Sequence, residues 1–418
     1  MPQQPLRQLP LLRDADASAS AHLPRDAEAS ASAHLPRDAE ASASAPIGAS
    51  EGEEANPPDA PDASEDWAWQ LRHALRTPAQ LERALRLTPS ERAGVERATN
   101  AGLPVSITPY YLSLCDPDDP SCPVRRQCVP VADEADDAPG DLADPLGEIA
   151  HEVAPNLVSR YPDRALLLVT DRCAVYCRFC TRSRMVGEGG GARPLERLEP
   201  AFRYIEEHPA LRDVIVSGGD PFAMTTDRLV RIVGRLRSIA SVETIRLATR
   251  VPVTLPQRVT PELVQALRPF HPLWVMTHFN HPKELTPRAR QACELLADAG
   301  FPVMNQSVLL RGINDRAETL EALFRGLVRS RVRPYYLLQA DPVRGTGHLR
   351  TPLARGLELM AALQGRLSGI ALPKFIVDTP GGMGKVPLVP DAIVARRPGQ
   401  TDLRTFRGVA TYYDPSVD

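Results

Sequence analysis

The stretch Thr170-Asp-Arg-Cys173-Ala-Val-Tyr-Cys177-Arg-Phe-Cys180-Thr-Arg182 places three cysteines in a Cys-x3-Cys-x2-Cys pattern, directly after the apolar run 165–170. Iron-sulfur cubanes are usually held by four cysteines, so three closely spaced ones predict an iron with an open coordination position where a small molecule can bind and react. A structural zinc site is one alternative, but its tetrahedron needs a fourth cysteine or histidine, and none lies nearby at a suitable spacing. Scattered reduced thiols are the other alternative. We predict that Cys173, Cys177 and Cys180 bind metal at a reaction centre.

This spacing resembles the signature of the radical S-adenosylmethionine (SAM) superfamily, and Phe179, the aromatic residue before the last cysteine, also fits it. The resemblance implies a [4Fe-4S] cluster whose open iron chelates the amino and carboxylate groups of SAM. An electron from the cluster would then cleave SAM to a 5'-deoxyadenosyl radical.

The bulk composition favours small molecules as the partners of this protein. The chain has 418 residues, 43% of them apolar, and a formal net charge of -3, which predicts one large domain with appendages and gives no reason to expect nucleic acid or a membrane as partner. No apolar run approaches the roughly 20 residues that span a bilayer, and the first residues contain no cleavable hydrophobic core. Seven cysteines, an odd number, suit a reducing compartment better than a disulfide framework. We therefore expect a cytoplasmic protein.

The N-terminal part divides into a repetitive region and a helical region. A 12-residue unit recurs within residues 13–45 and has too few large apolar side chains to offset the entropy of ordering. Residues 1–65 are therefore predicted to be disordered, a stacked repeat being the alternative. Residues 66–150 are predicted to be helical, because Thr-Pro pairs at 77–78 and 88–89 mark helix starts. The same region holds three more cysteines, and the alternatives for them are a metal site or packed thiols. They are Cys115, Cys122 and Cys128.

From residue 165 onward, short apolar runs alternate with amphipathic stretches such as 285–299 and 316–328, a pattern typical of βα units. We predict an α/β fold, an incomplete six-stranded TIM-like βα barrel of radical SAM type over residues 151–370, followed by a C-terminal segment, 371–418. In such barrels the chemistry gathers at the C-terminal ends of the strands, and the polar motifs of this sequence fall there. The expected strands are 165–170, 214–217, 244–248, 273–277, 303–308 and 335–339.

Two glycine motifs carry further chemistry. Ser217-Gly218-Gly219-Asp220-Pro221 follows the second expected strand, and its glycines let backbone groups approach a ligand closely. It resembles the Gly-Gly-Glu-Pro element that contacts the methionine amino group of SAM, with Asp220 in place of the commoner glutamate. The loop from Asp378 ends on Lys385, one of only three lysines. Such a lysine can form a Schiff base with pyridoxal phosphate (PLP), a solvated surface lysine being the alternative.

Taken together, these motifs resemble those of the lysine 2,3-aminomutase family, which combines radical SAM chemistry with PLP. The resemblance extends from about Asp66 to Asp414 and implies a [4Fe-4S] cluster, SAM and PLP as cofactors. Besides the cysteine motif and the two glycine motifs, it includes Trp69-Gln70 and residues 107–110, 160–164, 277–282, 305–315, 333–336 and 348–352.

Carried over residue by residue, the resemblance implies a PLP site and a substrate site. Lys385 would be the catalytic lysine that carries PLP as an internal aldimine. Arg182 would pair with the substrate carboxylate through its fork of donors. Two aspartates would bind the side-chain ammonium of lysine, although each alone could be a capping or solvated acid. The aspartates are Asp341 and Asp378, the PLP phosphate would be held by Arg160 and Arg164, and the other implied cofactor contacts are Ser217, Gly218, Gly219, Asp220, His278 and Gln306.

The chain departs from the family pattern at several positions. Better-known members carry a histidine where Phe179 stands, a tyrosine where Leu338 stands and a cysteine where Arg316 stands. They also have a cysteine-rich tail, whereas this chain has no cysteine beyond Cys293. The zinc site that links protomers in those relatives is therefore expected to be missing. The sequence then leaves the choice between a monomer and a homo-oligomer open.

The implied reaction interconverts L-lysine and β-lysine. The 5'-deoxyadenosyl radical would remove a hydrogen from C3, and the nitrogen would shift from C2 to C3. An aminomutase for another amino acid, such as arginine, or for a lysine side chain on a protein is the alternative, and a non-catalytic iron-sulfur or zinc protein is a more remote one. The expected partners are an amino acid and an electron donor such as flavodoxin or ferredoxin.

Overall fold

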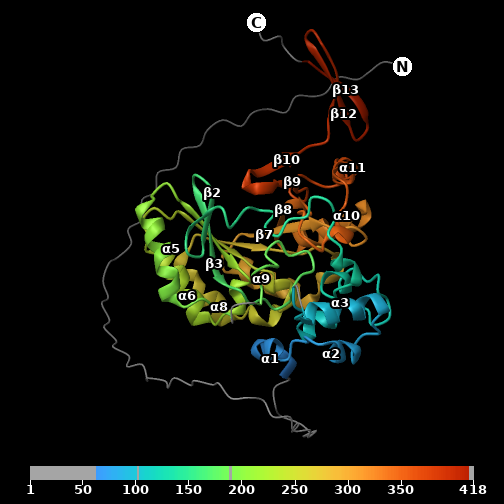
Figure 1. Ribbon diagram of the computed structural model, residues 1–418. Helices are drawn as coiled ribbons and strands as arrows, with labels where there is room; N and C mark the ends of the chain where they lie inside the picture. Colours follow the sequence, from blue (N-terminus) through green and yellow to red (C-terminus); the bar gives the residue numbers. More distant parts are fainter. Residues whose placement is uncertain (1–62, 101–102, 188–190, 414–418) are drawn as a thin grey trace, which may run out of the picture. The chain divides into compact units, whose positions relative to one another are not determined.

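A parallel β-sheet forms the centre of the fold in the computed structural model of the chain, which describes residues 63–100, 103–187 and 191–413 (Figure 1). The described residues belong to one compact unit. The predicted disordered region lies outside the described residues, except for its last three, Ala63–Glu65, which form a 3-10 turn, η1.

The main sheet contains ten strands in the order β1 to β10. The six strands expected from the sequence are all present as β3 to β8, and they run parallel. The expected count was too low, because β9 is a seventh parallel strand. The strands are β1 (Glu152–Ala154), β2 (Leu157–Tyr161), β3 (Arg164–Thr170), β4 (Asp213–Gly218), β5 (Thr244–Ala248), β6 (Leu273–Thr277), β7 (Val303–Leu309), β8 (Val332–Gln339), β9 (Lys374–Thr379) and β10 (Gly384–Leu388).

Strands from the C-terminal segment lie in two sheets. β9 and β10 belong to the main sheet, so this sheet extends into residues 371–418. The remainder forms a separate antiparallel sheet of three strands, β11 (Ile393–Arg397), β12 (Gln400–Thr405) and β13 (Gly408–Tyr413).

The two ends of the main sheet approach each other through side chains. The hydroxyl of Tyr161 on β2 accepts a hydrogen bond from the backbone N–H of Lys385 on β10, at 2.9 Å. Arg160, also on β2, forms an ion pair with Asp378 on β9, at 3.3 Å. The curved sheet therefore brings residues more than 200 positions apart in sequence to the same place.

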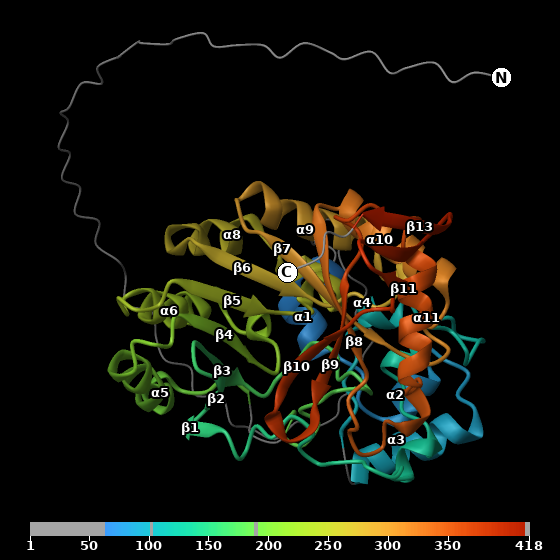
Figure 2. The ribbon, with the colours of Figure 1, turned by 90° about the horizontal axis from the view of Figure 1, so that it is seen from above.

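Helices with regularly spaced apolar residues cover the outside of the sheet (Figure 2). α6, for example, buries Leu229, Ile232, Val233 and Leu236 on one face. The expected helices at 285–299 and 316–328 are present as α9 and α10. The α-helices are α1 (Trp67–Arg72), α2 (Pro78–Glu82), α3 (Pro89–Asn100), α4 (Pro109–Leu112), α5 (Leu195–Glu207), α6 (Thr226–Arg237), α7 (Val251–Thr254), α8 (Pro261–Leu267), α9 (Pro287–Asp298), α10 (Ala317–Arg329) and α11 (Leu353–Leu363).

The helical N-terminal region is held by capping and by a buried ion pair. The predicted starts of α2 and α3 are confirmed, and the Thr77 side chain caps α2 by accepting from the N–H of Gln80 at 3.3 Å. Arg125 and Glu91 pair at 2.7 Å with side chains 0% and 4% exposed. Separating such a pair would leave an uncompensated buried charge, which costs free energy. The pair therefore fixes the 3-10 turn η2 (Arg125–Gln127) against α3.

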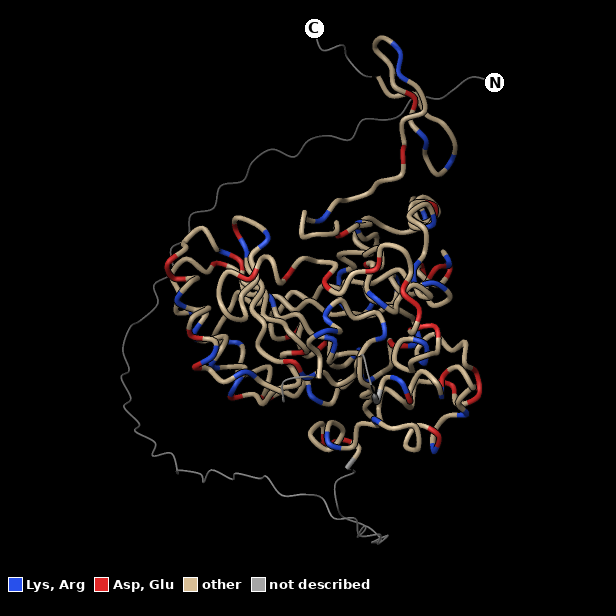
Figure 3. The backbone as a smooth tube through the Cα atoms, in the orientation of Figure 1, with Lys and Arg blue, Asp and Glu red and all other residues tan. Residues whose placement is uncertain are grey.

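Within the described part of the chain, no helix is long and apolar enough to cross a membrane. Basic and acidic side chains are interspersed along the same residues (Figure 3).

Candidate active site

The cysteine loop leaves the C-terminal end of β3, as expected for a barrel reaction centre. All three cysteines are half-buried free thiols, and the N–H of Cys180 donates to the carbonyl of Cys177 at 3.1 Å, which closes a tight turn. Burial, and then Cys177, raises the pKa of Cys180 to about 11. Burial, and then Asp220 and the other two thiols, raises the pKa of Cys173 well above its ordinary value. The thiols are therefore close enough to act on one another, and a metal that binds them must displace their protons.

The three thiols lie on one short loop after β3. Among the described residues, no three cysteine, histidine or acidic side chains converge on one point suited to a single metal ion. A cubane takes each cysteine on a different iron, which three neighbouring thiols on one loop allow. Cys115 and Cys128 are instead packed thiols, with their sulfur atoms 3.8 Å apart in the core of the N-terminal region.

The glycines of the second motif hold the cysteine loop against β4. Gly218 has a φ of +124°, and a Cβ there would lie 2.3 Å from the carbonyl oxygen of Thr170. A Cβ on Gly219 would lie 2.4 Å from the carbonyl oxygen of Arg172. Only glycine permits these contacts, so the motif fixes the start of the cysteine loop besides any ligand it contacts.

Asp220 and Ser217 of the same motif are both buried. The carboxylate of Asp220 accepts hydrogen bonds from the Thr249 hydroxyl and the N–H of Arg250, each at 2.7 Å, and from the N–H of Phe222 at 2.9 Å. Burial raises the pKa of Asp220 against the lowering effect of these bonds. Asp220 therefore ties β4 to the end of β5.

Arg182 lies against a buried carboxylate that the sequence did not identify. Its Nε donates to Glu148 at 2.9 Å, and its Nη2 lies 2.8 Å from the same carboxylate. The third nitrogen, Nη1, lies 3.5 Å from the hydroxyl of Ser217. Burial raises the pKa of Glu148, but Arg182 and Arg184 outweigh burial and lower it. Glu148 therefore orients Arg182 and leaves its Nη1 edge for another acceptor.

Lys385 and Asp378 face each other across the β9–β10 hairpin. The Lys385 ammonium contacts Asp378, whose carboxylate also accepts from Arg160 at 3.3 and 3.4 Å. Asp378 is buried, with 6% of its surface exposed. The structure thus brings together three predicted site residues, one from each of β2, β9 and β10.

Asp341 lies just past the end of β8 and is electrostatically coupled to this group. Burial, and then Asp378, raises the pKa of Asp341 to about 7, while Lys385 and Arg160 oppose the shift. Two carboxylates beside one lysine form a site that favours a bound cation.

Arg164 starts β3 beside Tyr161, with its guanidinium carbon 4.2 Å from the centre of the tyrosine ring. Its Nε lies 3.1 Å from a carboxylate oxygen of Asp163, an ion pair without hydrogen-bond geometry. Since Tyr161 also contacts the Lys385 backbone, Arg160 and Arg164 both lie near the lysine. Two guanidinium groups there fit the phosphate of PLP.

The remaining predicted residues lie at the ends of β6 and β7. His278 packs against Phe179 with 5.5 Å between ring centres, and its Nε2 lies 3.1 Å from the amide oxygen of Asn280. Burial, and then Arg250, lowers the pKa of His278 to about 3, so the imidazole is neutral near pH 7. Gln306 is half-buried on β7. Phe179 thus brings the cysteine loop into contact with His278.

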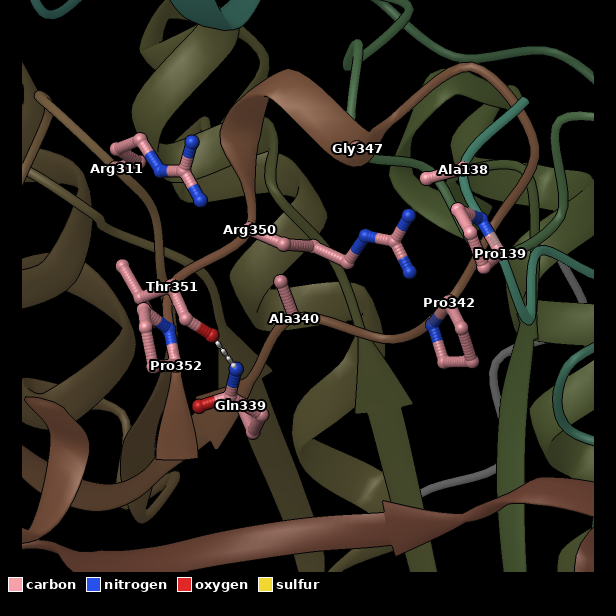
Figure 4. Close-up of a pocket in the computed structure, with 10 residues that line it drawn as sticks. All are labelled: Ala138, Pro139, Arg311, Gln339, Ala340, Pro342, Gly347, Arg350, Thr351 and Pro352. Carbon is pink, nitrogen blue, oxygen red and sulfur yellow. Dashed lines mark hydrogen bonds between the residues drawn. The ribbon is translucent and has the colours of Figure 1, made fainter. Parts of the chain in front are cut away.

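A cavity of about 410 Å³ opens at the end of β8, beside Asp341. Figure 4 shows Gln339 hydrogen-bonded to Thr351 there, with Arg350 reaching toward Pro139. This bond joins the side-chain nitrogen of Gln339 to the backbone carbonyl of Thr351, and the side-chain oxygens of both residues have no hydrogen-bond partner in the described structure. The cavity therefore offers polar groups at the end of β8.

Comparison with known proteins identifies the family. Residues 167–323 match the radical SAM superfamily, and residues 360–417 match the lysine-2,3-aminomutase family model. The chain is 47% identical over 353 residues to the L-lysine 2,3-aminomutase of Clostridium subterminale, which covers 84% of this chain and 85% of that protein. The chain belongs to the lysine 2,3-aminomutase family. Members of this aminomutase family are isomerases that use a [4Fe-4S] cluster, SAM and PLP.

Other relatives of this aminomutase differ in the substrate that their names give. The L-lysine 2,3-aminomutase of Bacillus subtilis is 47% identical, over 83% of this chain and 74% of that protein. The glutamate 2,3-aminomutase of Clostridioides difficile is 39% identical, over 85% of each. A solved radical SAM methyltransferase from Sphaerobacter thermophilus matches 53% of this chain and 68% of its own, at 22% identity and a TM-score of 0.39.

Three residues of the site carried no sequence signal strong enough to give them a role. Glu148 and Tyr161 contact Arg182 and Lys385, which lie 34 and 224 positions away in sequence. Arg250 belongs to none of the motifs that the sequence analysis singled out, yet it contacts Cys177 of the cysteine loop. Because these contacts are long-range, only the folded chain of this aminomutase reveals them.

Proposed function

We propose that this protein interconverts L-lysine and β-lysine by moving the amino nitrogen between C2 and C3. The observation that carries the proposal is the acidic pair Asp341 and Asp378 beside Lys385, because two carboxylates, one half-buried and one buried, suit the distal ammonium of a diamino acid. Relatives named L-lysine 2,3-aminomutase at 47% identity support the same substrate.

The cofactors divide the chemistry: the cluster and SAM supply a carbon radical, and PLP supplies a conjugated ring over which an unpaired electron spreads. The chain's own residues hold these groups and the substrate. Cys173, Cys177 and Cys180 would hold the cluster, and Ser217 to Asp220, His278 and Gln306 would line the SAM site. Lys385 would hold PLP, with its phosphate at Arg160 and Arg164.

The substrate would lie between two charged ends. Arg182 would bind the α-carboxylate through the Nη1 edge that Glu148 leaves unused. Asp341 and Asp378 would bind the distal ammonium. In the structure the ammonium of Lys385 contacts the carboxylate of Asp378. Once Lys385 holds PLP, the side-chain ammonium of a lysine substrate would take its place beside this carboxylate.

Further parts of the proposal concern the fold and the surroundings of the enzyme. The parallel strands would act as an incomplete barrel that shields radicals from water. Four regions would divide these roles. Residues 1–65 would form a tail, 66–150 a helical cover, 151–370 the core, and 371–418 the segment that holds PLP. A flavodoxin-like or ferredoxin-like protein of the cytoplasm would reduce the cluster, and copies of the chain would associate as a homo-oligomer.

The proposed function is tested by turnover of a panel of amino acids. Anaerobically reconstituted protein with SAM, PLP and a reductant is expected to convert lysine to β-lysine, detected by mass spectrometry, at least about tenfold faster than arginine, glutamate or a peptide with an internal lysine. Turnover of arginine with lysine inert would overturn the substrate. Absence of any β-amino acid product from protein that carries cluster and PLP would overturn the reaction.

Lysine binding is expected to strengthen as pH rises toward 7 and to level off above it. The pKa of Asp341 is raised to about 7, and the charged groups that face it are Asp378, Lys385, Arg160 and Glu148. The ammonium needs the ionised carboxylate, so below pH 7 binding must release a proton and affinity falls by about tenfold per pH unit. Titration of PLP-loaded protein with lysine, followed by absorbance, measures this.

The control for this pH dependence is Asp341→Asn, which removes the titrating group at constant size. We expect the variant to bind lysine about 10-fold to 100-fold more weakly at pH 8, from the loss of a charge-assisted hydrogen bond, and to lack the slope below pH 7. An unchanged slope in Asp341→Asn would assign the pH dependence to another group.

A further inference from the structure

Arg250 is a buried arginine that joins the cysteine loop to the rest of the fold. It follows β5, with 8% of its surface exposed. Its Nη1 donates to the sulfur of Cys177 at 2.7 Å. The contact is a charge-assisted one, because an arginine keeps its positive charge when buried.

The other nitrogens of Arg250 are held by separate parts of the chain. Nη2 donates to Gln127 at 2.6 Å, to Glu284 at 2.8 Å and to the Tyr111 hydroxyl at 3.0 Å. Nε donates to the backbone carbonyl of His278 at 3.2 Å. With this many partners the guanidinium has one orientation, so its hydrogen bond to sulfur is preorganised.

The anion that balances Arg250 is itself fixed. Glu284 is 0% exposed and accepts from the Tyr111 hydroxyl at 2.7 Å and from the N–H of Asn280 at 2.6 Å. Two of the groups that hold Arg250, Tyr111 and Gln127, come from the helical N-terminal region. This region therefore supports a residue that touches the reaction centre, besides covering the sheet.

We propose that Arg250 is a positioning residue that donates a hydrogen bond to the sulfur of Cys177 and thereby raises the reduction potential of the cluster. The inference rests on the proposed function, since it takes Cys177 as a cluster ligand. Reduction adds negative charge to a cluster, so a positive donor on a ligand sulfur stabilises the reduced form.

The test measures the reduction potential of reconstituted protein by redox titration followed by electron paramagnetic resonance, without substrate. Arg250→Met keeps much of the volume but removes the donor and the charge. Its potential is expected to be more negative, with the ratio of reduced to oxidised cluster falling about tenfold at a fixed potential, which is about 59 mV for a one-electron couple. Arg250→Lys, which keeps the charge, is expected to shift less.

Arg258→Met is the matched control. Arg258 is as buried, at 1% exposed, but its guanidinium donates to the backbone carbonyls of Phe222 and Met224, each at 3.0 Å. The control is expected to lose thermal stability while the potential stays unchanged. An equal shift in Arg258→Met, or no shift in Arg250→Met, would overturn the inference.

A second variant with the opposite sign keeps the test decisive if Arg250→Met does not fold. Glu284→Gln removes the balancing anion at constant shape, so the potential is expected to become more positive. A shift to more negative potential in Glu284→Gln would overturn the inference. Failure of the unaltered protein to bind any cluster would instead contradict the proposed function, so the two failures are distinguishable.

Discussion

Lys385→Ala is expected to lose bound PLP and to lower aminomutase activity by about 10³-fold or more, because PLP carries the chemistry of the nitrogen shift. The lysine lies on β10. Its ammonium contacts Asp378, and its backbone N–H donates to the hydroxyl of Tyr161. Absorbance of PLP measures the loss, and the visible absorbance of the iron-sulfur cluster should be retained. Borohydride reduction of the unaltered protein, followed by peptide mapping, should place the phosphopyridoxyl group on Lys385.

Two controls separate attachment of PLP from loss of an ion pair. Lys385→Arg keeps a positive charge beside Asp378 but cannot form a Schiff base, so it should behave like Lys385→Ala. Lys374→Ala removes an exposed lysine at the start of β9 and should behave like the unaltered protein. Retention of covalent PLP in Lys385→Arg, or its loss in Lys374→Ala, would contradict the assignment.

Cys173→Ala is expected to abolish cluster binding and, with it, reductive cleavage of SAM. Three cysteines already leave one iron open, and removing one leaves two thiolates for the cubane. We expect iron content near zero and SAM cleavage reduced by about 10³-fold or more, since the cluster is the source of the electron. Iron analysis and quantification of 5'-deoxyadenosine measure the two effects.

Cys293→Ala is the control, because Cys293 is a fully buried thiol in α9, outside the cysteine loop. It should bind iron like the unaltered protein. Cys115, Cys122 and Cys128 remain in both variants. Full iron content in Cys173→Ala would therefore show that the metal binds at those packed thiols. It would contradict the assignment of the cysteine loop as the cluster site.

The regular elements of the core could be predicted because their signals are local. The run 165–170 is apolar and short enough to be a buried strand, and it forms β3 within one residue of the expected bounds. β9 was not among the six strands expected for the barrel, because its pairing with β8 depends on how α11 returns the chain. The edge strands β1 and β2 have mixed exposure and no clear alternation, so no strand was expected there.

The candidate site was predictable where motif and spacing carry the chemistry. The cysteines and Lys385 belong to such motifs, and the structure places them at the ends of β3 and β10. The partners that set their environment belong to no motif. Glu148 orients Arg182, and Arg250 touches Cys177, through contacts across 34 and 73 positions of sequence.

The sequence by itself identified the candidate reactive groups of this protein: three thiols on one loop, one lysine after a glycine-rich turn, and two aspartates, one near the end of β9 and one just past β8. Local spacing is sufficient for this, because strand periodicity and turn residues act over a few positions. The tertiary structure alone decided the charge state and orientation of these groups. Asp341 reaches a pKa of about 7 only because the curved sheet buries it beside Asp378, and burial and Coulomb interactions depend on distances in space.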